Sequence, residues 1–124
     1  MGVQKTVIKE GNGVDRPKKY DNISIVYTGW IYDESKPENN FKGFLFSSTE
    51  LSEQKKDEFI GDIGIGEFMQ GFEEAIPEMS LGEKSTLTIS SDLAYDYVAW
   101  PEVLPPYSRL IFDVELKSIN GRRV

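Results

Sequence analysis

The sequence predicts an α+β domain in which a twisted antiparallel sheet of five to six strands packs against one short helix. Several short segments are rich in β-branched and aromatic residues and are separated by turn residues, which is typical of strands with short connections. One segment, at 70–79, has apolar residues at helical spacing, and Pro77 limits it to about two turns. The 124 residues are enough for one hydrophobic core, so we expect a single domain over 1–124.

The first half of the chain contains three predicted strands. VQKTVI at 3–8 alternates weakly, and ISIVYTGWI at 23–31 is β-branched and aromatic, which favours a strand buried on at least one face. FLFSS at 44–48 is short and apolar, as expected for a strand that returns to the sheet. The segments on either side of it, 33–43 and 49–58, are polar and are expected to be loops.

The second half contains the helix and two clearer strands. EFIGDIGIGEF at 58–68 has apolar alternation interrupted by three glycines. In the helix that follows, Phe72 and Ile76 share one face, although Pro77 disfavours helical geometry at Ile76. LGEKSTLTIS at 81–90 reads as a turn and a strand. The last strand is expected in RLIFDVELKSI, where one side carries Leu110, Phe112, Val114 and Leu116.

Composition excludes several classes of function. Asp and Glu (21) outnumber Lys and Arg (14), and the resulting charge of -7 argues against nucleic acid or an anionic membrane as the partner. The chain has no cysteine and no histidine, which excludes thiolate chemistry, the usual triads and most zinc sites. We expect no metal and no cofactor. No apolar run has the length of a signal peptide or membrane span, which predicts a cytoplasmic protein.

Two charged features are interpreted as solvated surface. Glu73 and Glu74 are adjacent on the predicted helix and face different directions, so they do not form a catalytic carboxylate pair. The basic ending GRRV at 121–124 is interpreted as a solvated tail.

The segment DLAYDYVAWPEVLPP at 92–106 is an apolar loop. Three prolines exclude a regular helix and interrupt strand pairing, yet the segment is rich in aromatic and aliphatic side chains. Loops lie at the surface, and exposed apolar clusters usually mark a binding site. The chain as a whole has more aromatic side chains than one sheet face under one short helix can bury, although any single one fits a core position. The set is Tyr27, Phe46, Phe59, Phe68, Phe72, Tyr95, Trp100 and Phe112.

Several motifs in this order resemble the FKBP family of macrolide-binding peptidyl-prolyl cis-trans isomerases. They are VYTGWI at 26–31, FSS at 46–48, QGFEEAIPEMSLGEK at 70–84, DLAY at 92–95, VLPP at 103–106 and LIFDVEL at 110–116. The resemblance extends over nearly the whole chain. It implies a sheet wrapped around the short helix, with a pocket between them that is roofed by 92–106.

The resemblance also implies site residues and partners. The catalytic residues it implies are Tyr27, Ser47, Tyr95 and Phe112. The substrate or macrolide contacts it implies are Phe46, Phe59, Glu67, Phe68, Met69, Phe72, Trp100, Val103 and Leu104. The implied partners are proline-containing peptides or proteins and macrolides of the FK506 and rapamycin type, bound by a monomer.

Four residues depart from the family pattern. Ser47 stands where the family usually has Asp, Phe72 replaces the Trp of the pocket floor, Gly61 replaces a second strand aromatic, and Asp96 replaces a glycine. We therefore expect isomerase activity and macrolide affinity below those of an ordinary member. The alternatives are a proline-pocket binding or scaffold module with vestigial catalysis, and a pocket reassigned to a small metabolite. The two polar insertions, 33–43 and 49–58, are either tolerated loop length or contacts to a partner.

Overall fold

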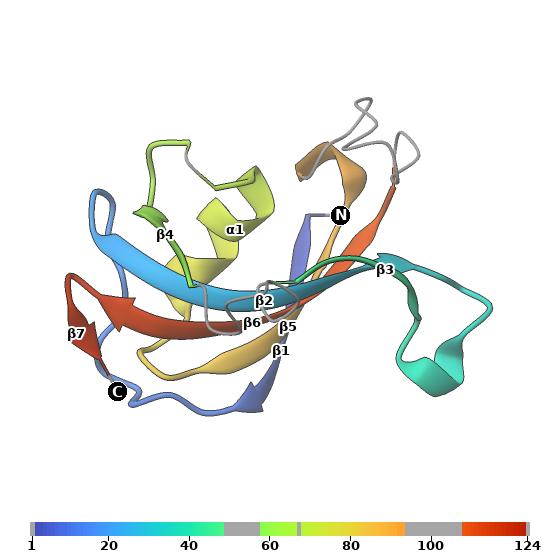
Figure 1. Cartoon of the computed structure of the whole chain (residues 1–124), viewed down its shortest axis with the longest axis horizontal. Helices are drawn as coiled ribbons and strands as arrows, with labels where there is room; N and C mark the ends of the chain where they lie inside the picture. The colour runs from blue at the N-terminus through green and yellow to red at the C-terminus, as the bar shows by residue number, and fades with distance from the viewer. Residues whose placement is uncertain (1, 49–57, 67, 94–107, 124) are drawn as a thin grey trace.

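The computed structural model describes residues 2–48, 58–66, 68–93 and 108–123, apart from the side chain of Ser47. These residues form a seven-stranded antiparallel sheet and one short α-helix (Figure 1). The strands are β1 (Val3–Lys9), β2 (Asn22–Tyr32), β3 (Lys42–Ser48), β4 (Phe59–Asp62), β5 (Lys84–Ile89), β6 (Leu110–Ile119) and β7 (Arg122–Arg123). The helix α1 is Gln70–Ala75, and 3-10 turns lie at Pro37–Asn39, Ile76–Glu78 and Ser91–Leu93. No helix in the described ranges is long and apolar enough to cross a membrane.

The sheet has the order β1-β5-β6-β2-β3, with β4 paired to the start of β2 and β7 paired to the end of β6. The α+β prediction is confirmed, but the sheet has seven strands where the sequence predicted five to six. One strand that the sequence did not predict is β7, which pairs with β6 after a turn at Asn120 and Gly121. These residues have φ of 50° and 81°, the left-handed pair that a tight hairpin turn requires. Arg122 and Arg123 therefore belong to a strand and not to a free tail, although both stay exposed, as the sequence predicted.

Figure 1 shows α1 against one face of the sheet. The buried side chains of these two elements form most of the core. Phe72 and Ile76 share the buried face of the helix, with 5% and 0% of their surface exposed. Gly71 permits this close packing, because a Cβ there would lie 2.7 Å from Cγ2 of Ile89 in β5. On β6 the predicted alternation is present, and Ile111 on the opposite side is also buried.

The end of the helix differs from the prediction. Ile76 has helical φ and ψ of -63° and -36°, although it precedes Pro77. The α-helix ends at Ala75, and Pro77 falls at the start of a 3-10 turn, where its missing N–H is not needed. The backbone N–H of Met79 donates to the Ile76 carbonyl at 2.9 Å and closes that turn.

The first insertion, 33–43, contains the 3-10 turn Pro37–Asn39, and its last two residues already belong to β3. Phe41 stacks on Tyr32 with ring centroids 5.2 Å apart. Lys42 lies 4.3 Å above the Trp30 ring and forms an ion pair with Asp113 at 2.9 Å. The insertion is thus attached to the sheet by stacking and by charge. The second insertion lies outside the described residues except for its last position, residue 58.

A buried carboxylate joins β1 to the start of β5. The Glu83 side chain is 4% exposed and accepts hydrogen bonds from Lys5 Nζ and Ser85 Oγ, both at 2.7 Å, and from the Ser80 amide at 3.1 Å. Burial raises the pKa of Glu83, but these hydrogen bonds together outweigh burial and hold the pKa below its ordinary value. The ionised form of Glu83 is therefore part of the folded structure.

Candidate functional site

Six of the predicted site residues form one aromatic cluster, defined here as Tyr27, Phe46, Phe59, Phe68, Phe72 and Phe112. At its centre, Phe112 is 1% exposed. The Phe112 centroid lies 4.8 Å from that of Phe72, 5.6 Å from Phe46 and 5.8 Å from Tyr27, and all three contacts are T-shaped. Edge-to-face contacts of this kind each contribute about 0.5–1.5 kcal/mol beyond burial, so the rings hold one another in place.

The cluster reaches the surface through Phe59, which is 40% exposed. Its centroid lies 5.1 Å from Phe68 and 6.4 Å from Tyr27. Tyr27 is partly buried and also contacts Phe72 edge-on at 6.0 Å. A buried aromatic floor is therefore continuous with partly exposed rings that a ligand can contact.

Gly29 explains how the Phe112 ring comes to lie so close to β2. The two residues are directly paired between β2 and β6. A Cβ on Gly29 would lie 2.6 Å from Cε1 of Phe112, closer than real contacts allow, and 3.0 Å from Cζ of Phe46, which is tighter than most real contacts. The glycine of the YTG motif thus leaves the space that both rings occupy.

The other predicted site residues are described only in part. Ser47 lies in β3 opposite Gly29, which places it beside the cluster in the backbone pairing. Met69 precedes α1 and packs, partly buried, against the core. The departure at Gly61 falls in β4, opposite Ile23. The predicted residues outside the described part of the chain are Glu67, Tyr95, Trp100, Val103 and Leu104, together with the departure at Asp96.

Sequence reasoning missed the role of Glu73. Its carboxylate accepts hydrogen bonds from the amides of Gly64, of Gly66 at 3.2 Å and of Phe68 at 3.3 Å. It is therefore not simply a solvated helix charge. The available signal was the pair of glycines just before the helix, since a loop with left-handed residues presents amides that need an acceptor.

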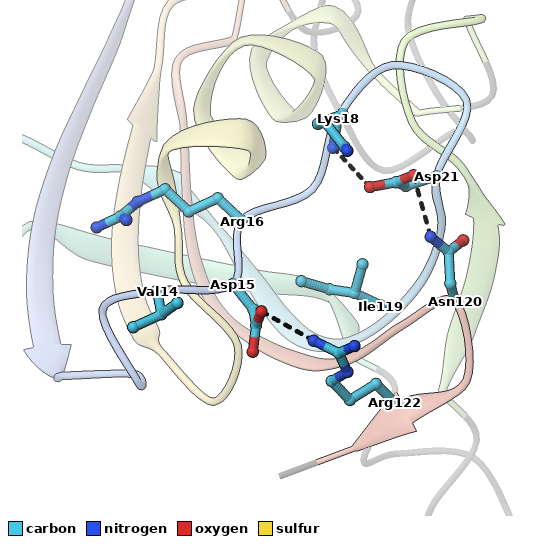
Figure 2. A pocket seen from close by; sticks show the side chains of 8 residues that line it. All are labelled: Val14, Asp15, Arg16, Lys18, Asp21, Ile119, Asn120 and Arg122. Carbon is cyan, nitrogen blue, oxygen red and sulfur yellow. Dashed lines mark hydrogen bonds and ion pairs between the residues drawn. The ribbon is translucent and has the colours of Figure 1, made fainter.

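A separate hollow of about 430 Å³ lies at the far end of β6 (Figure 2). Its lining residues are Val14, Asp15, Arg16, Lys18, Asp21, Ile119, Asn120 and Arg122. In Figure 2, Arg122 reaches Asp15 at 2.9 Å, and Asp21 lies between Lys18 and Asn120. The Lys18 amide and then the Asn120 side chain hold the pKa of Asp21 below its usual value.

The carboxylates in this hollow are therefore already bonded within the chain. At roughly 3.3 Å per residue, Ile119 is about 23 Å along β6 from Phe112, so the hollow is remote from the aromatic cluster. The next arginine, Arg123, binds both carboxylate oxygens of Glu58. Both arginines at the C-terminal end thus form ion pairs at the surface, and both side chains remain exposed. In the described ranges, no group of three or more acidic residues is arranged to hold a metal ion.

Comparison with known proteins agrees with the resemblance in the motifs. The family model described as FKBP-type peptidyl-prolyl cis-trans isomerase matches residues 13–117. The chain is 42% identical to a peptidyl-prolyl cis-trans isomerase of Schizosaccharomyces pombe and 44% identical to FK506-binding protein 1A of Aspergillus fumigatus, with 99% of both chains covered in each case. It is 39% identical to FK506-binding protein 1B of Aspergillus fumigatus, over 97% of this chain and 96% of the relative. The chain therefore belongs to the FKBP-type peptidyl-prolyl cis-trans isomerase family.

Proposed function

We propose that this family member rotates Xaa-Pro peptide bonds at the aromatic cluster, with Phe72 and Phe112 as the floor and Tyr27, Phe46 and Phe59 as walls. The observation that carries the proposal is the convergence of six aromatic side chains from separate elements, with buried rings at the centre and Phe59 at the surface. A prolyl ring is apolar, so it gains contact with such a surface without needing a charged partner.

The physics of amide rotation suits such a site. The barrier to rotation is about 18–20 kcal/mol, and the cis and trans forms of Xaa-Pro differ by only about 0.5–1 kcal/mol. The twisted transition state has lost amide resonance and much of the dipole of the planar form. An apolar pocket therefore disfavours the planar ground state more than the twisted state, and each 1.4 kcal/mol of this preference changes the rate about tenfold.

Further residues enter the proposal from the resemblance to the family. Tyr95 donates a hydrogen bond to the substrate carbonyl, and Ser47 takes the position of the acidic residue that polarises the pocket. The remaining proposed contacts are Glu67, Phe68, Met69, Trp100, Val103 and Leu104. Proline-containing proteins are the proposed substrates, and the names of the FK506-binding relatives support a macrolide of that type as a ligand. We further propose a monomeric, cytoplasmic protein with one domain.

The proposed activity is weaker than that of an ordinary family member. Ser47 supplies no charge, and Phe72 keeps an aromatic face but lacks the indole N–H of a tryptophan. A protease-coupled assay with an Xaa-Pro peptide tests the activity, and a rate equal to buffer alone would overturn it. The double variant Ser47→Asp plus Phe72→Trp should raise the rate above wild type.

A binding or scaffold module with vestigial catalysis is the second candidate. The observation that favours it is the exposure of Phe44 (59%) and Leu45 (38%) on β3, next to the first insertion. Exposed apolar side chains of this kind are typical of contact surfaces. If wild type gives no rate above buffer, and the double variant gains activity while binding to proline-containing proteins is unchanged, the natural chain is better described as a binding module.

A further inference from the structure

We infer that the Glu73 carboxylate is a positioning residue for the isomerase reaction, because it fixes the loop that carries Phe68 to the start of α1. The inference rests on the proposed function, since it assigns Glu73 a role at the same aromatic cluster. Glu73 is not one of the six aromatic residues of the cluster, so its inferred role is to position a residue that is.

The contacts of Glu73 converge on one short loop. The amides of Gly64, Gly66 and Phe68 all donate to its two carboxylate oxygens. The amides of these alternate residues, 64, 66 and 68, can all reach Glu73 because of the loop conformation. In this loop Gly64 and Gly66 have φ of 88° and 84°, values that favour glycine. A carboxylate is suited to this task because its two oxygens offer about four acceptor positions. The backbone N–H of Glu73 donates to Met69 O at 3.0 Å, so the residue is itself fixed in the first turn of α1.

The loop is anchored independently at its beginning. Ile63 is fully buried, its carbonyl accepts from the Tyr20 amide at 2.8 Å, and its own amide donates to Asp21 O at 2.9 Å. At the other end, the Met69 carbonyl accepts the first hydrogen bonds of α1. Between these anchors, the amides of Gly64, Gly66 and Phe68 are held by their bonds to Glu73.

The last of these amides belongs to an aromatic residue of the cluster. Phe68 is 7% exposed, and its ring lies 5.1 Å from Phe59. Phe59 in turn contacts Tyr27 at 6.4 Å. If the carboxylate is lost, the Phe68 backbone is released and the exposed side of the cluster moves with it. Because displacements of about 1 Å at a site cost large factors in rate, the effect on isomerisation should exceed the effect on overall stability.

The chain offers a matched control in the next residue. Glu74 is exposed on the same helix, and its carboxylate accepts from Gln70 Nε2 at 3.3 Å. Glu73→Gln and Glu74→Gln therefore remove the same charge from adjacent positions. They differ in whether the carboxylate holds the loop.

The experiment measures amide exchange, the free energy of unfolding, and kcat/KM per folded molecule on an Xaa-Pro peptide. In Glu73→Gln, the amides of Gly64, Gly66 and Phe68 should exchange faster, while that of Leu87 in the core strand β5 is unchanged. Because charge-assisted hydrogen bonds are lost, kcat/KM should fall about tenfold. Glu74→Gln should stay within about twofold of wild type, as surface substitutions usually do.

Gly66→Ala provides a second perturbation of the same loop. A Cβ at this residue meets nothing within 4 Å, so alanine acts through the strained φ alone and should lower kcat/KM as Glu73→Gln does. If Glu73→Gln does not fold, this variant decides the question. If wild type is active, and Glu73→Gln folds and keeps the wild-type kcat/KM, the role of Glu73 is overturned but the proposed function is not. A wild type without isomerase activity would overturn the proposed function and this role together.

Discussion

Gly29→Ala adds one methyl group at the centre of the aromatic cluster. The new Cβ would lie 2.6 Å and 2.9 Å from two ring atoms of Phe112 and 3.0 Å from Cζ of Phe46. Gly29 does not have a positive φ, so its backbone conformation suits alanine and the conflict is with the rings alone. The substitution therefore tests the packing of the cluster directly.

Two opposing effects set the size of the change. Alanine in the middle of a strand is ordinarily more stable than glycine by about 0.5–1 kcal/mol, because glycine loses more backbone freedom on folding. Forcing an extra methyl into a well-packed core costs about 1–3 kcal/mol. The Phe112 and Phe46 rings are packed against neighbouring side chains, so the steric cost of the methyl group should exceed the gain in backbone entropy. We expect a net loss of about 1–2 kcal/mol in the free energy of unfolding, together with a lower isomerase rate.

Urea unfolding followed by circular dichroism measures this loss, and the protease-coupled assay measures the rate. Phe112→Leu provides the internal check, because a smaller side chain makes room for the methyl group. The two substitutions should therefore be non-additive by about 1 kcal/mol or more, with the double variant more stable than the sum of the single variants implies. A Gly29→Ala protein as stable as wild type, or more stable, would contradict the packing described for Phe112 and Phe46.

Three other expectations concern charge. The folded pKa of Glu83 is lowered, so its ionised form stabilises the fold above the unfolded pKa of about 4.3, and this contribution is lost as pH falls through the folded value. In urea unfolding between pH 6 and pH 3, the free energy of unfolding should depend less on pH for Glu83→Gln than for wild type. The same pH dependence in both proteins would count against the buried pair with Lys5. Lys42→Met removes the ion-pair partner of Asp113, which keeps its hydrogen bond from Thr86 Oγ1. The substitution should cost about 1–2 kcal/mol in thermal unfolding, part of which Asp113→Asn restores. Calorimetry should find weak rapamycin binding that tightens in Ser47→Asp, and ordinary tight binding by wild type would refute the importance given to Ser47.

The elements with strong local patterns could be predicted from the sequence. The alternation in β6 and the β-branched run in β2 located both central strands, and the spacing of Phe72 and Ile76 identified the buried face of the helix. The motifs also led to the family and to six aromatic side chains that the structure brings together. These features depend on periodicity and on short stretches of chain, which a sequence displays directly.

Features that depend on distant partners were missed. Arg123 and Glu58 are far apart in the sequence, and only the sheet brings them together. Glu73 looked like a surface charge because its partners are backbone amides, and the two glycines before the helix were the sole sign of them in the sequence. The turn at Asn120 and Gly121 had a recognisable signal, but the arginines after it lack the apolar alternation that normally indicates a strand.

The pairing of β2 with β6 has a consequence for how the protein is made. The middle of the sheet joins Ile23 to Ile119 and Ile31 to Leu110, so its ladder links segments from opposite ends of the chain. Contacts between residues so distant in sequence form slowly, because a large loop must close first. During translation, β2 emerges from the ribosome long before its central neighbour exists. β3 and β4 can pair with one edge of β2 earlier, but the edge that pairs with β6 stays open until β6 is synthesised, and in that interval a chaperone has an exposed strand edge to bind.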